Sequence, residues 1–458
     1  MRTDHAFSCM IEGISNMLRK CNSKTLRIEN DKRNNDYPEG FFHLTLCLIF
    51  FFILVHVGLA TASPVAISAN PVNGATGVSQ TADLVSITFN KPMNTAYRSV
   101  STSNWSSSFF TNYWSEDGKT LYLPRQDVHY PFVPHTKVMI MINLPGYENI
   151  RDTEGNFAEE YNLTFWIESI NYQKIAAQPE KGFHWPYLLY VPETARSSAL
   201  LLVEPNNSGV PSDDFAFHEG RAESFLNIRS PFAYVLKAPL LVPIFPRYED
   251  LYTQALDRTA LLTQRENLVR IDLQLIAMVD DAIERLAGKG IKSNKKFFMI
   301  GFSASGAFVS RFSAIHPERI MAAAIGSPGG WPIAPVATWW GHNMTYDLGI
   351  SDLDVVTGTP FNLSEFNKVP LFLYLGDKDD NWDSQDVSTE LHFLGETIQE
   401  RWIVAEDIYQ SIGSSAKFVL YPGIGHITTN DIWLDIEAFL IKHSKRTRVM
   451  PWLQLLLD

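Results

Sequence analysis

Cysteine is scarce in this chain, and the positions of the few cysteines limit the chemical roles that they can have. The three cysteines, Cys9, Cys21 and Cys47, all lie within the first 62 of the 458 residues. Beyond Ala62 the chain can therefore form no disulfide, bind no metal through a thiolate and use no cysteine nucleophile. Its stability has to come from the size of its core. A hydrophobic content of 45% over this length suffices for about two domains.

Clustered positive charge is also lacking. The formal net charge is −12, and nothing basic and extended precedes the short run from Lys442 to Arg448. Because contacts with phosphate groups need gathered lysines and arginines, the sequence argues against a nucleic-acid-binding protein. The basic run is expected to be a solvated part of a C-terminal tail, which we place at residues 444–458.

One long apolar run lies near the N-terminus. Residues 41–60 are almost all apolar, and Ala60-Thr61-Ala62 follows with the small-x-small pattern that signal peptidase accepts. We interpret residues 1–62 as an N-terminal extension that carries a signal peptide or a signal anchor; a later start, such as Met17, is an alternative. The expected location is secreted or cell-surface, with membrane contact only if the apolar run is retained.

Residues 64–168 contain short β-like runs and no helical period. Turn clusters at Asp117-Gly118 and at residues 152–156 separate these runs. Short strands at this spacing predict an N-terminal all-β sandwich. The runs are residues 84–89, 120–123, 137–142 and 163–167.

The motifs of this segment resemble those of the Ig-like modules repeated in bacterial and archaeal surface-layer and secreted proteins. The resemblance rests on Asn70-Pro71-Val72-Asn73-Gly74-Ala75-Thr76-Gly77-Val78, on residues 87–94 and on the two turn clusters. It implies a spacer, a packing partner or a weak surface binder, and not a catalyst.

From residue 172 to residue 443, β-rich apolar runs alternate with helical patterns. This alternation predicts an α/β domain with a mostly parallel sheet flanked by helices. Apolar residues recur every three or four positions over residues 267–286, which predicts an amphipathic helix that Gly288 and Gly290 end. The candidate strands are residues 187–191, 199–204, 240–245, 297–300, 321–325, 371–375 and 417–421.

Gly301-Phe302-Ser303-Ala304-Ser305-Gly306 follows one of these strands and precedes a helix-compatible run at residues 307–317. A serine on a tight turn between a strand and a helix projects its hydroxyl out of the backbone, so Ser303 is the candidate nucleophile. Ser305 occupies the position where such turns usually have glycine. Its hydroxyl is expected to bond a backbone carbonyl rather than to react.

The strand at residues 371–375 is followed by Gly376-Asp377-Lys378-Asp379-Asp380. The turn resembles the G-x-x-D turn of serine hydrolases, and this register selects Asp379 as the acid that would orient a histidine. Asp377 and Asp380 remain alternatives. A calcium loop is the competing interpretation, but Trp382 and Ser388 occupy the positions where such a loop needs glycine and a bidentate glutamate. We therefore expect no metal site.

Tyr421-Pro422-Gly423-Ile424-Gly425-His426 follows the last candidate strand and precedes a predicted helix at residues 431–441. Its glycines allow a loop to carry His426 to the edge of the sheet. The chain order serine, aspartate, histidine is that of the α/β-hydrolases. His218, His316 and His342 have no comparable setting.

Further residues are candidates for binding the substrate and the oxyanion. The backbone N–H of Ala304, directly after the nucleophile, is one expected oxyanion donor, and Asn206 or Asn207 is the second unless the two asparagines only form a turn. Trp331 is a candidate wall above the serine or an ordinary packing aromatic. Arg247 is a candidate for the cleft or for a structural ion pair.

Together these motifs make residues 172–443 resemble the α/β-hydrolase superfamily, nearest to secreted esterases and poly(3-hydroxyalkanoate) depolymerase-like enzymes. The resemblance implies a serine hydrolase that cleaves ester bonds through an acyl-enzyme, needs no cofactor and acts on an ester or polymer, such as an extracellular or cell-envelope polyester. Serine peptidase and acyltransferase chemistry remain alternatives on the same fold. A non-catalytic surface adhesion or scaffold protein is the alternative from another class.

Overall fold

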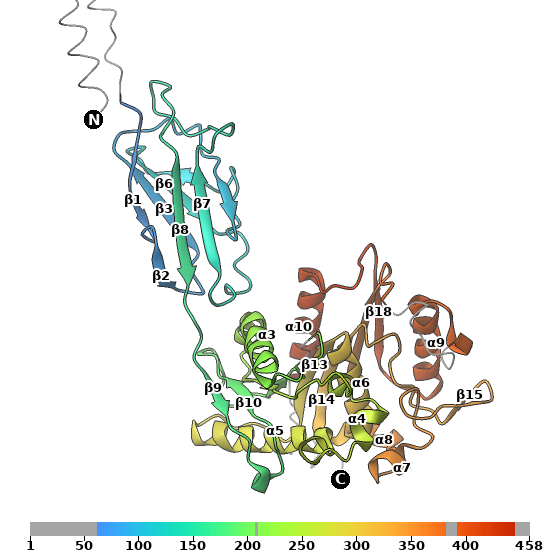
Figure 1. Ribbon diagram of the computed structural model, residues 1–458. Helices are drawn as coiled ribbons and strands as arrows, with labels where there is room; N and C mark the ends of the chain where they lie inside the picture. The colour runs from blue at the N-terminus through green and yellow to red at the C-terminus, as the bar shows by residue number, and fades with distance from the viewer. Residues whose placement is uncertain (1–61, 207–208, 382–391, 445–458) are drawn as a thin grey trace, which may run out of the picture. The chain divides into compact units, whose positions relative to one another are not determined.

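The computed structural model of the protein describes residues 62–206, 209–381 and 392–444 (Figure 1). The predicted N-terminal extension, Asn207, Trp382, Ser388 and the predicted tail beyond residue 444 lie outside the described residues. Within the described ranges, no helix combines the length and the apolar character needed to cross a bilayer. The apolar run at residues 41–60 lies outside these ranges.

The first described part is a β-sandwich of two four-stranded sheets, as predicted. Side chains along β3 (Leu84–Phe89) and β7 (Lys137–Ile142) alternate between buried and less buried positions. Val85, Ile87 and Phe89 from one sheet therefore meet Val138 and Ile140 from the other in a single apolar core. One sheet has the order β1 (Ala66–Asn70), β3 (Leu84–Phe89), β6 (Thr120–Pro124), β5 (Tyr113–Trp114), and the other β2 (Ala75–Val78), β8 (Tyr161–Ile167), β7 (Lys137–Ile142), β4 (Ser101–Ser103).

The second part is built on an eight-stranded sheet. Its order is β18-β17-β14-β13-β11-β12-β10-β9, so strands follow the chain across the sheet except where β11 and β12 exchange places. Strands β9, β10 and β12 pair antiparallel, and all other pairs are parallel. The bounds are β9 (Tyr172–Ile175), β10 (Tyr187–Tyr190), β11 (Leu202–Val203), β12 (Leu240–Pro243), β13 (Phe297–Phe302), β14 (Ile320–Gly326), β17 (Leu371–Gly376) and β18 (Lys417–Tyr421).

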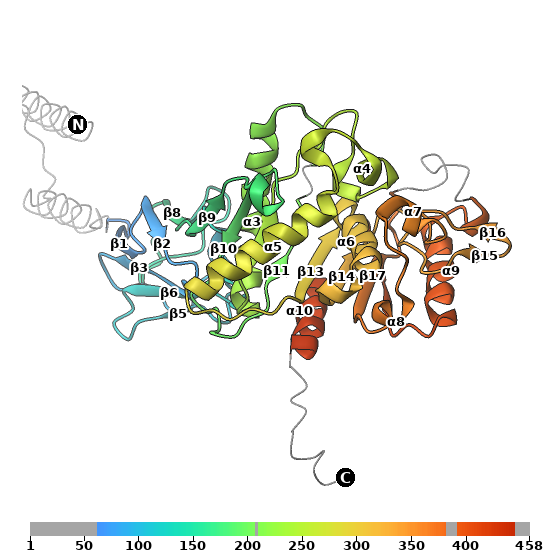
Figure 2. The same ribbon diagram turned by 90° about the horizontal axis from the view of Figure 1, so that it is seen from below.

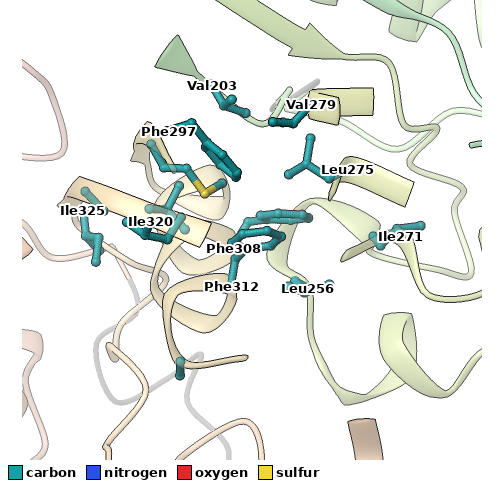
Figure 3. Close-up of a cluster of buried hydrophobic side chains, with 14 of the residues drawn as sticks. Val203, Leu256, Ile271, Leu275, Val279, Phe297, Phe308, Phe312, Ile320 and Ile325 are labelled. Carbon is teal, nitrogen blue, oxygen red and sulfur yellow. The ribbon is translucent and has the colours of Figure 1, made fainter. Parts of the chain in front are cut away.

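Helices cover both faces of this sheet, which explains why its central strands are buried on both sides. One face packs against α5 (Ile271–Gly288), α6 (Ala304–Ile315) and α9 (Ile398–Ser411) (Figure 2). Figure 3 shows Leu275 and Val279 of α5 together with Phe308 of α6 and Phe297 of β13. The opposite face packs against α3 and α10, through residues such as Leu226. The sheet order and the two helical layers confirm the expected α/β-hydrolase fold.

The remaining elements connect or flank these layers. The α-helices are α3 (Phe215–Leu236), α4 (Arg258–Leu262), α5 (Ile271–Gly288), α6 (Ala304–Ile315), α7 (Leu353–Thr357), α8 (Leu363–Phe366), α9 (Ile398–Ser411) and α10 (Asn430–Ser444). Short 3-10 helices are η1 (Pro179–Lys181), η2 (Thr253–Ala255), η3 (Glu266–Leu268), η4 (Pro317–Arg319) and η5 (His392–Leu394), and one hairpin pairs β15 (Thr338–Trp339) with β16 (His342–Asn343).

Two predicted elements begin at least three residues later than expected. The helix predicted from residue 267 begins at Ile271, because Glu266–Leu268 forms η3 and Arg270 has a left-handed φ of 50° that breaks a continuous helix. The strand predicted over residues 199–204 is only Leu202–Val203, although every residue of the run except Leu200 is buried. The run is therefore apolar because it lies in the core, and not because all of it pairs with a neighbouring strand.

Candidate active site

Ser303 lies on the turn between β13 and α6, in a backbone conformation with φ 59° and ψ −125°. Its N–H donates to the carbonyl of Gly326 in β14 at 2.9 Å. The flanking glycines are required by close approach: a Cβ at Gly301 would lie 2.4 Å from the Ser305 carbonyl oxygen, and one at Gly306 would lie 2.3 Å from the Gly326 oxygen. This strained strand–turn–helix setting is that of a nucleophile elbow.

The hydroxyl of Ser305 is engaged by the turn itself. It donates to the Phe302 carbonyl at 2.8 Å and accepts the Phe302 N–H at 2.9 Å, while the residue is 1% exposed. Ser305 therefore closes the turn with side-chain hydrogen bonds. Its hydroxyl has no role left as a nucleophile.

The loops after β17 and β18 bring Asp379 and His426 together. Asp379 Oδ2 lies 2.9 Å from His426 Nδ1, although 46 residues separate the two in the chain. The carboxylate is 1% exposed, and Asn381 donates its N–H to Oδ1 at 3.1 Å. Burial raises the pKa of Asp379, but hydrogen bonds from His426 and Ser327 lower it by more, so the carboxyl is ionised well below neutral pH.

The two alternative acids have other surroundings. Asp377 Oδ1 accepts the N–H of Gly423 at 2.6 Å, which ties the loop that carries His426 to the end of β17. Asp380 is exposed. The geometry therefore favours Asp379 as the partner of the imidazole.

Ser327 is a polar member of this site that the sequence did not indicate. Its Oγ lies 2.5 Å from Asp379 Oδ2 and 3.1 Å from His426 Nδ1. In the sequence it lies four residues before Trp331, the candidate wall above the serine. The available signal is its position one residue after β14, because residues that follow neighbouring parallel strands meet at the same sheet edge.

The elbow and the imidazole are neighbours. The ring of Phe302, next to Ser303, lies 4.7 Å from the ring of His426. Within residues 62–206, 209–381 and 392–444, however, no hydrogen bond joins the Ser303 hydroxyl to His426, and Nε2 instead lies 3.2 Å from the side-chain amide nitrogen of Asn381. Because Nδ1 donates to Asp379, Nε2 is the acceptor nitrogen and Asn381 occupies it. Such catalytic hydrogen bonds often tighten only when substrate binds.

The expected oxyanion donors differ in whether their N–H groups already have a hydrogen-bond partner. Ala304 is the first residue of α6, where a backbone N–H has no partner within the helix. Asn206 is 2% exposed, and its side-chain amide donates to the His218 carbonyl in α3 at 3.4 Å. One of its two side-chain N–H groups is therefore engaged with a helix carbonyl.

The two expected substrate residues make structural contacts. Trp331 is 4% exposed, donates Nε1–H to the Leu348 carbonyl at 2.9 Å and packs in a cluster with Met344. Arg247 donates to the Gly209 carbonyl, and its guanidinium lies 3.9 Å from the ring centroid of Tyr252. Trp331 thus matches the packing alternative, and Arg247 stacks on a ring.

A metal centre has no counterpart in the described part of the chain. There, no group of three or more histidine, cysteine, aspartate or glutamate side chains is arranged to hold an ion. The site itself places the Ser303 hydroxyl on a strained turn near the hydrogen-bonded pair of Asp379 and His426.

Residues 60–166 match the family model of the bacterial Ig-like domain. The match covers most of the β-sandwich and agrees with the resemblance of its motifs. For the whole sequence, a search of curated proteins finds no match.

Several solved structures are similar to this chain over more than half of its length. Poly(aspartic acid) hydrolase-1 from Sphingomonas sp. KT-1 is 16% identical with a TM-score of 0.44, over 60% of this chain and 98% of that one. A poly(3-hydroxybutyrate) depolymerase from Bordetella parapertussis is 15% identical with a TM-score of 0.43, over 62% and 92%. A thermostable esterase is 15% identical with a TM-score of 0.37, over 86% and 99%. These values are too low to assign an activity, and the fold is defined by the strand order itself.

Proposed function

We propose that this protein is an exported serine hydrolase that cleaves carboxylic esters through Ser303, Asp379 and His426. The observation that carries the proposal is the 2.9 Å hydrogen bond between Asp379 and His426, formed at the sheet edge where Ser303 occupies a strained elbow. A buried carboxylate that fixes the tautomer of an imidazole next to such a serine is the arrangement that activates a hydroxyl.

In the proposed reaction, His426 Nε2 takes the proton of Ser303 as Oγ attacks the ester carbonyl carbon. The backbone N–H of Ala304 donates to the oxyanion, and the imidazolium returns the proton to the departing alcohol oxygen. Water, deprotonated by the same imidazole, then releases the acid and restores the serine. Asn381 has to yield Nε2 to Ser303 before the first step, because the amide now occupies that nitrogen.

Export and an extracellular ester or polymer substrate complete the proposal. They are supported by the apolar run at residues 41–60 with its small-x-small end, and by the bacterial Ig-like match at residues 60–166. The net charge of −12 supports a partner other than nucleic acid. Detection of the protein in the culture medium or at the cell surface after expression tests the location.

Active-site labelling tests the chemistry. Protein starting at residue 63 should react with a fluorophosphonate probe and hydrolyse short-chain p-nitrophenyl esters, and Ser303→Ala should lose labelling and at least roughly 10⁴-fold in kcat/KM. Ser313→Ala is the matched control, because Ser313 is a buried serine of α6 whose hydroxyl donates to the Val309 carbonyl. The control should keep both signals.

Two outcomes would contradict the proposal. Folded protein that neither labels nor turns over any ester, peptide or polyester in a panel would favour the scaffold interpretation. Labelling at Ser303 with turnover of peptides alone, or with acyl transfer to an added alcohol in preference to water, would keep the nucleophile and replace the reaction class.

A further inference from the structure

We propose that Ser327 is a positioning residue for the Asp379–His426 pair, which holds the carboxylate, and through it the imidazole, in one orientation. The inference rests on the proposed function and deepens it, because it adds a fourth side chain to the three that the sequence motifs indicate. Ser327 acts through Asp379 and does not itself contact the reacting atoms.

The contacts of Ser327 form a closed triangle. Its Oγ is 2.5 Å from Asp379 Oδ2 and 3.1 Å from His426 Nδ1, and those two atoms are 2.9 Å apart. An ionised carboxylate only accepts, so the serine O–H and the imidazole N–H both donate to Oδ2. Asn381 supplies a third donor to Oδ1. Donors from the loops after β14, β17 and β18 thus fix both oxygens of one carboxylate.

Because the Asp379 carboxylate is buried, each hydrogen bond that it accepts contributes to keeping it ionised. Ser327 and Asp379 are each 1% exposed, so bulk water has little access to replace a lost hydrogen bond. Burial by itself raises the pKa of Asp379, and the hydrogen bonds from His426 and Ser327 are the main influences that lower it. The Ser327 hydroxyl therefore helps keep the carboxylate charged in a place where an unpaired charge is costly.

The backbone around Ser327 is held on two sides. Its N–H donates to the Tyr374 carbonyl of β17 at 2.9 Å, and the preceding carbonyl, that of Gly326, accepts the N–H of Ser303. A Cβ at Gly326 would lie 2.1 Å from the ring of Tyr374, so the strand end fits closely against β17. Gly326 thus contacts the backbone of the nucleophile, and Ser327 contacts the Asp379–His426 pair. The position from which the Ser327 hydroxyl projects is therefore fixed by the backbone.

A structural role for the same hydroxyl predicts different behaviour, and two variants separate the roles. Ser327 has a φ of 41°, a left-handed conformation whose backbone strain is a cost for any non-glycine residue. Ser327→Ala removes the hydroxyl and keeps this cost, whereas Ser327→Gly removes the hydroxyl and relieves it. Ser327→Gly should therefore unfold at a higher temperature than Ser327→Ala.

If Ser327 positions the pair, both variants lose kcat by a similar factor, roughly 10- to 100-fold, with little change in KM, whatever their stabilities. Removal of one donor from Oδ2 leaves more of its charge for the imidazolium, so the acidic limb of the pH profile of kcat/KM should move to higher pH in both variants. The Ser313→Ala control should show neither change.

A proton NMR measurement gives a readout that needs no turnover. An imidazole N–H that donates to a buried carboxylate resonates far downfield, and this signal should shift in both Ser327 variants and not in Ser313→Ala. Activity that follows thermal stability across the two variants, with an unmoved pH profile and resonance, would overturn the positioning role.

The outcomes for this inference and for the proposed function are distinguishable. Loss of turnover in Ser303→Ala together with wild-type kinetics in both Ser327 variants sinks only the role of Ser327. Turnover that survives Ser303→Ala sinks the proposed function, and the imidazole resonance then still decides whether Ser327 holds the pair.

Discussion

Three aspartates follow β17 within four positions, and each has a different role because its surroundings differ. Asp379 is buried and receives N–H and O–H donors on both oxygens. Asp377 accepts the N–H of Gly423 from the histidine loop, and Asp380 is exposed. The same residue type thus serves as the partner of an imidazole, as a tie between loops and as a solvated surface group.

Substitution of the buried and of the exposed aspartate tests this division. Asp379→Asn should lower kcat by roughly 10⁴-fold, because an amide cannot accept all these donors and favours the wrong imidazole tautomer. Asp380→Asn should stay within about 2-fold of wild type, since surface changes of this kind are small. Ester hydrolysis at saturating substrate, with thermal unfolding as a folding check, gives the measurement. An equal loss in Asp380→Asn would refute the assignment.

The spacing of Gly376 and Asp379 was enough to predict the acid but not to exclude its neighbours. All three aspartates share one local sequence, so propensity and register treat them almost alike. What separates them is burial and contact with loops 46 or more residues further along the chain, which no local pattern contains. The same reason hid Asn381, whose amide contacts His426 Nε2 from the acid loop.

At the scale of elements, the site depends on how closely α6 approaches the sheet. Gly306 in its first turn faces the carbonyl of Gly326 in β14, the same carbonyl that accepts the N–H of Ser303. The Gly326 carbonyl therefore links two things: how closely α6 packs on β14, and how the backbone of Ser303 is oriented. The sequence indicated these glycines through the elbow motif, but their partner in β14 lies 20 residues away from Gly306.

A methyl group at Gly306 should disturb both functions of this contact. Gly306→Ala places a Cβ 2.3 Å from the Gly326 oxygen, so we expect a loss of about 1–3 kcal/mol in the free energy of unfolding and a lower kcat. Gly220→Ala, at an exposed position of α3 with no atom near the added Cβ, should instead stabilise by up to about 1 kcal/mol. Urea unfolding measures both; equal effects would contradict the close approach.

At the scale of the whole molecule, a buried ionic cluster joins distant parts of the α/β domain. His316 Nε2, at the end of α6, lies 2.8 Å from Asp272 Oδ2 in the first turn of α5. Arg270 donates to both oxygens of Asp272 and to the Thr357 carbonyl of α7. The cluster lies outside the candidate active site, and its role is in stability.

The pKa changes in this cluster predict how stability varies with pH. Burial lowers the pKa of His316, but hydrogen bonds to Asp272 and Glu318 raise it above the usual value, so its contribution is present at low pH and is lost as the pH rises through the raised value. Burial raises the pKa of Asp272, while His316 and Arg270 lower it to about 2. Its contribution is present above the ordinary aspartate pKa and is lost as the pH falls towards 2.

The variant His316→Gln tests the first part. It should destabilise by about 1–3 kcal/mol near pH 5.5, where His316 is charged in both states, and by less near pH 9. Urea unfolding of both proteins at the two pH values gives the difference, and His342→Gln, at an exposed histidine, is the control. A difference that grows with pH would show that His316 is buried in its neutral form.

The sequence by itself determined the fold class and the order of the chemical motifs, because both can be recognised from residues close together in the chain. The spacing of short β-like runs predicted the sandwich, and the alternation of apolar runs with helical patterns predicted the helix-flanked sheet. The glycine-flanked serine motif between a strand and a helix predicted the elbow around Ser303. Backbone geometry responds to neighbours a few positions away, so these features need no knowledge of the rest of the molecule.

Tertiary structure alone decided which side chains meet. Ser327 contacts Asp379 across 52 residues and His426 across 99, through strand ends that become neighbours only when the sheet forms. The burial of Trp331 and the engagement of the Asn206 amide with α3 were settled in the same way. Contact and burial depend on the packing of distant segments, and that information is present in the folded chain as a whole and not in any one stretch of it.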